Sequence, residues 1–347
     1  MSKQKKRILA AYAYDQPTLT ISQEDARKLT HINIAFGKFD QGNILVDGLD
    51  LISKVDQLKN WNPGLKILLS MVGAGPDDFS VVCATEAGRR KMAASCAETV
   101  SQYNLDGIDL DWEYPCCPSN NIASSPEDKI TFTLLCKEIR KALDQVDGRY
   151  RLLTIAAGAD QHFVDGTEMD KVQRYLDYVF LMTYDLRCGF HSLTGHHTNL
   201  YTATGDIFRN SLEAAVNIFL KAGVPKAKIV PGAAFYSRRW EGVRNRNNGF
   251  LQVATTRGVH GPPYHDLIEQ YINKNGFIRY WDDECKSPWL FDGNSYISYE
   301  DEQSIGYKCR YIRQEQLPGL FYWQHGSDRT GTLLQALHEG LEEHEHE

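Results

Sequence analysis

Residues 105–115 read LDGIDLDWEYP and carry the most informative pattern in this chain. Three acids, Asp109, Asp111 and Glu113, follow one another at a spacing of two residues. This spacing is the period at which side chains of a β-strand point to one face. The residues between them, an isoleucine, a leucine and a tryptophan, would point to the opposite, apolar face. We therefore expect one strand to bring three carboxylates together. Like charges held this close raise the pKa of at least one carboxyl group, which can then act as a general acid.

Two other interpretations of this stretch are less consistent with the pattern. A solvated acidic strand explains the negative charge but not the strict alternation with apolar residues. A calcium-binding loop of the EF-hand type needs a glycine after its third acidic ligand, whereas Gly107 precedes the acids. An active-site strand is the favoured interpretation.

Short apolar runs alternate with longer amphipathic stretches along most of the chain. The predicted strands are 7–14, 31–37, 66–73, 107–114, 151–158, 178–185, 228–235 and 319–323. The predicted helices between them include 86–103, 126–146, 210–222 and 299–314. Nearly continuous apolar strands are typical of parallel sheets covered by helices, which places the chain in the α/β class. Polar residues stand at the carboxyl ends of many strands, and this favours a (β/α)8 TIM barrel over a doubly wound sheet.

Residues 237–299 interrupt the alternation after the seventh predicted strand. They contain glycine, proline and aromatic clusters but no single simple helix. A structureless loop of this length is uncommon in a compact domain. We therefore predict a small α+β insertion domain at 237–299, within a catalytic barrel formed by residues 1–236 and 300–347.

Composition limits the possible partners and compartments. The net charge of -7 argues against nucleic acid, because phosphate binding needs a basic face. No stretch approaches the length of a membrane span. The 8 cysteines form no CxxC pattern, and the apolar run near the N-terminus is too short for a signal peptide. We expect a cytoplasmic protein with reduced thiols, or a secreted one if a signal peptide has been removed.

The stretch LDGIDLDWEYP resembles the DGxDxDxE signature of glycoside hydrolase family 18, the chitinases. Four further segments resemble motifs of this family in the same order. They are LLSMVGAG from Leu68, MTYD from Met182 with the loop TGHHTNLY, AAFYSRRW from Ala233, and LPGLFYWQHGSD from Leu317. The resemblance extends from about residue 7 to residue 337. Val72 and Ser237 stand where the family has glycine, and Gln324 stands where it often has glutamate.

This resemblance implies a retaining hydrolase of β-1,4-linked N-acetylglucosamine chains, that is, chitin or chitooligosaccharides. In such enzymes the substrate's own 2-acetamido group attacks the anomeric carbon and forms an oxazolinium intermediate, which water then opens. At the matching positions, Glu113 would be the acid and base, and Asp111 would bind the acetamide N–H and steady the positive charge. Asp109 would share a proton or charge with Asp111, and Tyr184 would donate to the acetamide oxygen.

The resemblance also implies a set of substrate-binding residues. Asp185 would bind the distorted sugar, and Trp323 would form the apolar floor beneath it. The other matching positions are Met182, Tyr236, Arg238, Tyr12, Phe36 and Ser70. For Met182 and Phe36, ordinary barrel packing is an equally good interpretation. Trp240, Trp281, Trp289 and Phe190 are interpreted as packing residues rather than platforms for further sugars.

Two alternative functions stay open. A non-catalytic chitin-binding lectin on the same fold typically lacks the acid, whereas Glu113 is present. A hydrolase of N-acetylglucosamine linkages in peptidoglycan or glycoproteins would use the same chemistry, but the predicted insertion favours long linear chains. No metal or organic cofactor is implied, and a monomer is expected. Endo or exo cleavage does not follow from these residues.

Overall fold

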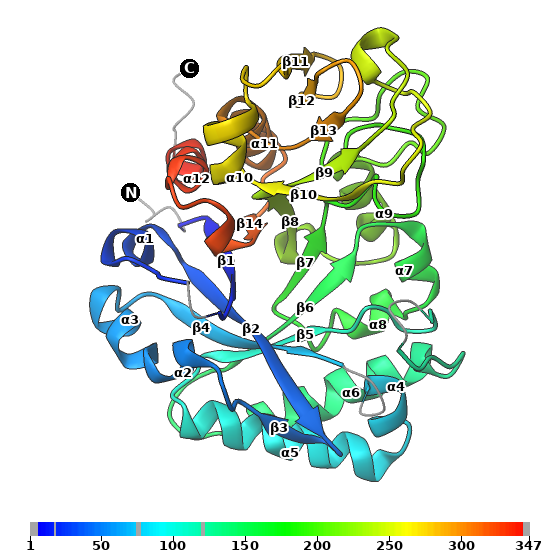
Figure 1. Cartoon of the computed structure of the whole chain (residues 1–347). Helices are drawn as coiled ribbons and strands as arrows, with labels where there is room; N and C mark the ends of the chain where they lie inside the picture. The colour runs from blue at the N-terminus through cyan, green and yellow to red at the C-terminus, as the bar shows by residue number, and fades with distance from the viewer. Residues whose placement is uncertain (1–5, 17–18, 74–77, 119–121, 343–347) are drawn as a thin grey trace. The chain divides into compact units, whose positions relative to one another are not determined.

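The computed structural model describes residues 6–16, 19–73, 78–118 and 122–342. All eight predicted strands are present: β1 (Ile8–Tyr14), β2 (His31–Asp40), β4 (Lys66–Val72), β5 (Gly107–Asp111), β6 (Leu152–Gly158), β7 (Tyr178–Met182), β8 (Ile229–Ala234) and β14 (Gly319–Trp323). They belong to one sheet in the order β1-β14-β8-β7-β6-β5-β4-β2, labelled in Figure 1. A further pairing of β1 with β2 closes the eight strands into a ring, so the predicted (β/α)8 barrel is confirmed.

The chain divides into two compact units. The N-terminal unit consists of residues 10–181 and 218–230, and the C-terminal unit consists of residues 1–9, 182–217 and 231–347. This division differs from the predicted barrel and insertion. The boundaries 1–236, 237–299 and 300–347 therefore stay a prediction.

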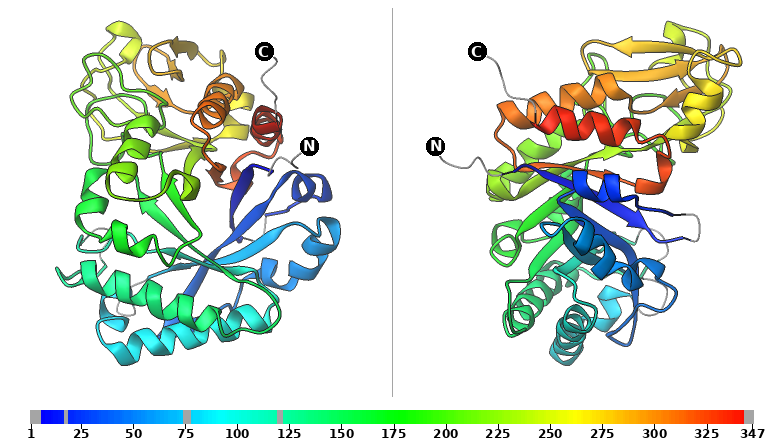
Figure 2. Two further views of the ribbon diagram at one scale, coloured as in Figure 1. Left: turned by 180° about the vertical axis from the view of Figure 1, so that it is seen from behind. Right: turned by 90° about the vertical axis from the view of Figure 1, so that its left-hand side faces the viewer.

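Helices cover the strands of the N-terminal unit. They are α1 (Gln23–Lys28), α2 (Asp50–Ser53), α3 (Val55–Trp61), α4 (Phe79–Val82), α5 (Glu86–Gln102), α6 (Asp128–Leu143), α7 (Gln161–Asp165) and α8 (Met169–Val172). The two longest, α5 and α6, pack against each other and lie side by side in Figures 1 and 2. These two confirm the helices predicted at 86–103 and 126–146. All residues of β5 are buried, as expected for a parallel strand with both faces covered.

The parallel register of the barrel strands places polar residues next to one another. Ser70 on β4 is opposite Asp109 on β5, and Asp109 is opposite Thr154 on β6. All three side chains are buried. The strands therefore carry a polar layer inside an otherwise apolar core. In addition, β3 (Asn43–Leu45) pairs with the end of β2 in an antiparallel hairpin.

The C-terminal unit contains a second, antiparallel sheet. Its strands are β9 (Tyr236–Trp240), β10 (Val259–Pro263), β11 (Ile278–Asp282), β12 (Ser287–Phe291) and β13 (Tyr296–Ser298), in the order β10-β9-β13-β12-β11. The short helix α10 (Tyr264–Asp266) and a π-helical turn (Leu267–Tyr271) lie in the same stretch. Residues 237–299 therefore have the mixed strand and helix content that the sequence predicts.

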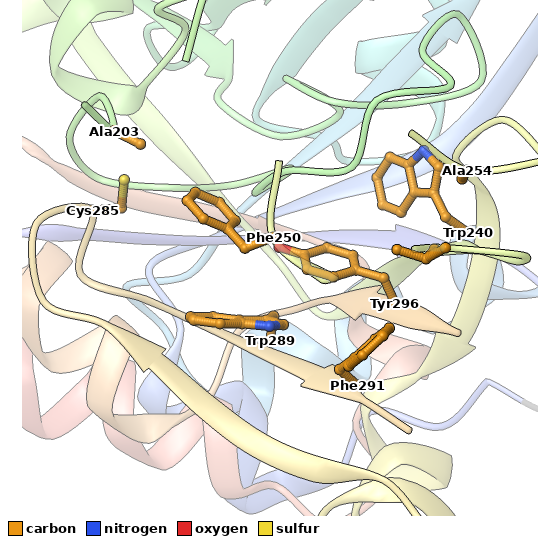
Figure 3. Close-up of a cluster of buried hydrophobic side chains, with 9 residues drawn as sticks. Ala203, Trp240, Phe250, Ala254, Cys285, Trp289, Phe291 and Tyr296 are labelled. Atoms are coloured by element: carbon orange, nitrogen blue, oxygen red, sulfur yellow. The ribbon is translucent and has the colours of Figure 1, made fainter. Parts of the chain in front are cut away.

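An aromatic core supports this antiparallel sheet (Figure 3). Trp240, Trp289 and Tyr296 are buried, and the Phe250 ring centroid lies 5.5 Å from that of Trp289. Aromatic pairs of this kind stabilise a core beyond the area they bury. The interpretation of Trp240 and Trp289 as packing residues is confirmed. Phe190 is 81% exposed, so the same interpretation is wrong for that residue.

Three further helices belong to the second half of the chain: α9 (Leu212–Lys221), α11 (Glu302–Gln314) and α12 (Thr332–Glu342). They confirm the predicted helices at 210–222 and 299–314. α11 packs against α12, and its Lys308 is fully buried. Within the described residues, no helix combines the length and apolar character needed to cross a membrane.

Candidate active site

The three acids do not all lie on the strand, which corrects the prediction for 107–114. β5 ends at Asp111, so Glu113 follows the strand by two residues. Asp109 and Asp111 are buried, and Glu113 is half-buried. The predicted apolar side is confirmed: the ring of Trp112 stacks on Phe79 with centroids 5.3 Å apart. The acids therefore lie at the carboxyl end of a barrel strand, where this fold carries its chemistry.

Asp106 and Gly107 position the start of β5. Asp106 is buried; it accepts a hydrogen bond from the backbone N–H of Ile67 at 2.9 Å and pairs with Lys59 at 2.8 Å. At Gly107, a Cβ atom would lie 2.1 Å from the backbone oxygen of Leu152 on β6. Only glycine allows β5 and β6 to approach this closely. The DG dipeptide therefore sets the register from which the acids follow.

Asp109 accepts hydrogen bonds from three hydroxyls on three other strands, β1, β4 and β6. Tyr12 Oη and Ser70 Oγ donate to Oδ2 at 2.8 and 2.7 Å, and Thr154 Oγ1 donates to Oδ1 at 2.5 Å. Complete burial raises the pKa of Asp109, and these hydrogen bonds partly offset the rise. Of the predicted residues, Tyr12 and Ser70 therefore contact the innermost acid.

Asp111 has a strongly perturbed carboxyl group. Burial raises its pKa well above the usual range, and the nearby charges of Glu113 and Asp109 raise it further. Within the described part of the chain, its buried Oδ1 has no hydrogen-bond partner. The predicted effect of crowded carboxylates is thus confirmed for Asp111. Its Oδ1 is thus a buried acceptor with no donor among the described residues.

The C-terminal unit holds a second polar cluster, centred on Asp185. Tyr236 Oη and Arg238 Nε donate to Asp185 Oδ1 at 2.7 and 2.6 Å, and Arg238 Nη2 donates to Oδ2. Burial raises the pKa of Asp185, but the neighbouring His197 ring and the hydrogen bonds from Arg238 outweigh burial and hold this pKa below its usual range. Asp185 is therefore an ionised, fixed acceptor. The structure brings the predicted Asp185, Tyr236 and Arg238 into direct contact.

Tyr184 lies beside this cluster, two residues beyond β7. Its ring centroid is 6.0 Å from those of Tyr236 and Phe321, both in edge-to-face contact. Met182 and Trp323 stand at the ends of β7 and β14, and both are half-buried. Half-burial leaves part of each side chain accessible to a ligand.

Phe36 is the least constrained of the predicted residues. It belongs to the N-terminal unit, is half-buried, and has its ring centroid 6.2 Å from that of Tyr14. Its role in binding stays a prediction.

Two polar residues at these clusters were not predicted from the sequence. Thr154 is the one polar side chain in the run LLTIAAG of β6, and this exception to an apolar strand was a usable signal. His197 is fully buried, with Nδ1 3.7 Å from Asp185 Oδ1, and burial lowers its pKa. His197 lies in the loop TGHHTNLY, whose resemblance to the family was a usable signal, but its contact with Asp185 depends on the fold.

One other group of side chains has the atoms that could bind a metal ion. The potential ligand atoms of His196, Asp282 and Cys285 all lie within 4.8 Å of one another. Hydrogen bonds already occupy the carboxylate: His196 Nε2 is 3.1 Å from Oδ2, and two backbone N–H groups donate to Oδ1. We therefore interpret this group as a satisfied buried carboxylate and assign no metal to it.

Comparison with known proteins points to one family. The family model described as glycosyl hydrolases family 18 matches residues 8–328. Chitinase A1 from Niallia circulans is 38% identical over 306 residues, which are 82% of this chain and 44% of that protein. Chitinase B from Serratia marcescens is 30% identical over 396 residues, covering 92% of this chain and 78% of that protein. The chain thus spans less than half the length of the first relative.

A solved structure is more similar still. A family 18 N-acetylglucosaminidase from Paenibacillus barengoltzii is 53% identical to this chain, with a TM-score of 0.94. The match covers 96% of this chain and 99% of that one. Similarity of this extent includes both the barrel strands and the antiparallel sheet.

Proposed function

Since the chain belongs to glycoside hydrolase family 18, we propose that it hydrolyses β-1,4-linked N-acetylglucosamine chains with retention at the anomeric carbon. The observation that carries this proposal is the series of acids at the end of β5. Asp109 accepts hydrogen bonds from three hydroxyls, Asp111 is buried with a raised pKa, and Glu113 is half-buried just beyond the strand. A series that runs from buried to accessible is suited to moving a proton to a bound substrate.

In the first step, Glu113 donates its proton to the glycosidic oxygen. The acetamido oxygen of the substrate attacks the anomeric carbon, the bond to the leaving sugar breaks, and an oxazolinium ion forms. Asp111 accepts the acetamide N–H with its unpartnered oxygen. The developing positive charge favours the ionised carboxylate, because an opposite charge nearby lowers a carboxyl pKa.

In the second step, Glu113 takes a proton from water. The water oxygen bonds to the anomeric carbon as the acetamide oxygen leaves, which restores the acetamido group. Two displacements at the same carbon give net retention. Asp109 does not touch the substrate in this scheme: its three hydroxyl donors hold it beside Asp111, with which it shares a proton or charge.

The Asp185 cluster supplies the substrate-binding side of the proposal. Arg238 and Tyr236 hold the Asp185 carboxylate in one orientation, where it accepts from a sugar hydroxyl. Tyr184 donates to the acetamide oxygen, and Trp323 packs on the apolar face of the sugar. These roles rest on the resemblance of the MTYD, FYSR and final-strand segments.

We further propose that the protein releases single N-acetylglucosamine units from short chitooligosaccharides. The support is the 53% identity to a structure described as an N-acetylglucosaminidase. An endo-acting chitinase would instead release mainly dimers and trimers from the interior of a long chain. Product length separates these two modes.

The test is incubation of the protein with chitohexaose and, separately, with peptidoglycan fragments, with products followed by mass over time. We expect shortened chitooligosaccharides and free N-acetylglucosamine, and no peptidoglycan products. Glu113→Gln should lower the rate at least about 100-fold. Binding of chitohexaose without cleavage would refute the proposed hydrolytic activity and support the lectin alternative.

A further inference from the structure

Tyr184 and Asp185 are bracketed by two hydrogen bonds from one neighbouring segment. The backbone N–H of Leu186 donates to the carbonyl of His197 at 3.0 Å. Thr198 Oγ1 donates to the carbonyl of Thr183 at 3.1 Å. The residues just before and just after this dipeptide are therefore held by two consecutive residues, His197 and Thr198.

The dipeptide needs such support, because Asp185 has an unfavourable backbone conformation. Its φ of +58° lies in the left-handed region, which residues with a side chain rarely adopt. A conformation of this kind persists only where surrounding contacts determine it. Arg238 and Tyr236 hold the Asp185 carboxylate, but they do not hold its backbone.

Thr198 is itself fixed by a buried ion pair. Lys308 Nζ donates to Thr198 Oγ1 at 2.8 Å and also to Glu300 Oε1, and both charged side chains are 0% exposed. Ser304 Oγ donates to the other oxygen of Glu300 at 2.7 Å. Thr198 Oγ1 is also within donating distance of Glu300 Oε1, at 2.9 Å, so its single proton is shared between Glu300 and the carbonyl of Thr183, and the hydroxyl links the ion pair to that carbonyl.

A buried ion pair is weak support for stability alone, since apolar residues of the same volume often stabilise a fold equally well. The Lys308–Glu300 pair, however, contacts the Thr198 hydroxyl, which in turn contacts the backbone of the proposed substrate-binding segment. We propose that Thr198 is a positioning residue for Tyr184 and Asp185, and that the buried Lys308–Glu300 pair holds Thr198 in place. The inference rests on the proposed function, in which Tyr184 and Asp185 contact the sugar.

The test compares Thr198→Val, Thr198→Ser and Thr167→Val in the whole protein, with chitotetraose as substrate. Thr167 is the matched control: it is buried and donates to the carbonyl of Phe163 at 2.8 Å, in the N-terminal unit. Steady-state kcat and KM are measured at a temperature at which circular dichroism shows every variant folded. Affinity for chitotetraose is measured by calorimetry in a Glu113→Gln background.

We expect Thr198→Val to lower kcat/KM about 10- to 100-fold and to weaken chitotetraose binding. Thr198→Ser should behave as the unmodified protein, and Thr167→Val should lose thermal stability without losing kcat/KM. The inference is wrong if Thr198→Val retains the kinetics of Thr167→Val, or if Thr198→Ser is as impaired as Thr198→Val.

A second variant keeps the inference testable if Thr198→Val does not fold. Lys308→Met combined with Glu300→Gln removes the anchor without leaving a buried charge, and should lower kcat/KM to a similar degree. Wild-type kinetics in this double variant would overturn the role of the pair. If the unmodified protein neither cleaves nor binds chitotetraose, the proposed function fails and the positioning role fails with it. If it cleaves and only the Thr198 comparison fails, the proposed function stands.

Discussion

Replacing Asp111 by asparagine should make the protein more stable and less active. The Asp111 carboxylate is buried, its Oδ1 has no partner within the described residues, and two further carboxylates lie nearby. A buried polar group without a partner costs about 1–3 kcal/mol, and more when it is charged. Asparagine removes the charge but keeps the shape. The unpartnered oxygen also stays, so the gain comes from removing a carboxyl group whose pKa is raised by folding; one pKa unit is worth about 1.4 kcal/mol. We therefore expect the free energy of unfolding at pH 7 to rise by about 1.4 kcal/mol or more, while kcat falls at least about 100-fold.

The pH dependence of this gain follows from the raised pKa of Asp111. A carboxyl group whose pKa is raised by folding destabilises the folded state as pH increases from its unfolded pKa, about 3.8, through its folded pKa. Below the unfolded pKa both states are protonated, and this contribution is absent. The advantage of Asp111→Asn should therefore be largest near neutral pH and should disappear in acid.

The assay is urea unfolding of both proteins at pH 7 and at about pH 4, close to the usual carboxyl pKa. Glu98→Gln is the matched control, because Glu98 is an exposed acid on α5 and its replacement should change stability by less than about 0.5 kcal/mol. A lower stability of Asp111→Asn at pH 7 would refute this reasoning. So would a gain that is the same at both pH values.

Three further predictions concern the buried polar groups. Asp109→Ala removes the acceptor of three hydroxyls and should lower the free energy of unfolding, measured in urea, by about 3–6 kcal/mol. Asp109→Asn should cost less, because a hydroxyl can also accept a hydrogen bond from an amide. Asp185→Asn should destabilise the protein at neutral pH. Because folding lowers the pKa of Asp185, its carboxylate stabilises the protein above the unfolded pKa, and this stabilisation is lost as pH falls through the folded pKa. The destabilisation by Asp185→Asn should therefore shrink when urea unfolding is repeated at lower pH. Lys308→Met should cost about 3–5 kcal/mol in the same assay by leaving Glu300 buried and unpaired, and adding Glu300→Gln should restore most of it.

The architecture could be predicted because each barrel strand can be recognised from its own short stretch of sequence. A strand covered on both faces needs a short, nearly continuous apolar run, and each of the eight runs became a strand. The end of β5 was less predictable. The alternation of acids and apolar residues continues to Glu113, whereas strand pairing stops at Asp111. Pairing depends on neighbouring strands, and side-chain alternation alone does not report it.

The site was predictable where the chemistry sits on a motif and unpredictable where it depends on long-range contacts. Asp109 and Tyr184 lie in recognisable segments. Thr198 and Lys308 are joined across 110 positions of sequence. A lysine on an amphipathic helix is ordinarily a solvated residue, and only the fold reveals that Lys308 is buried against Glu300.

The most direct test of the proposed chemistry is the anomer that the protein forms first. Chitotetraose hydrolysis would be followed by proton NMR from the first minutes, before the new reducing ends equilibrate, with Glu113→Gln as the inactive control. Substrate-assisted catalysis through Asp111 and Glu113 predicts that the β-anomer appears first and the α-anomer only later. Initial formation of the α-anomer would mean that water displaces the leaving sugar directly, and would contradict the mechanism.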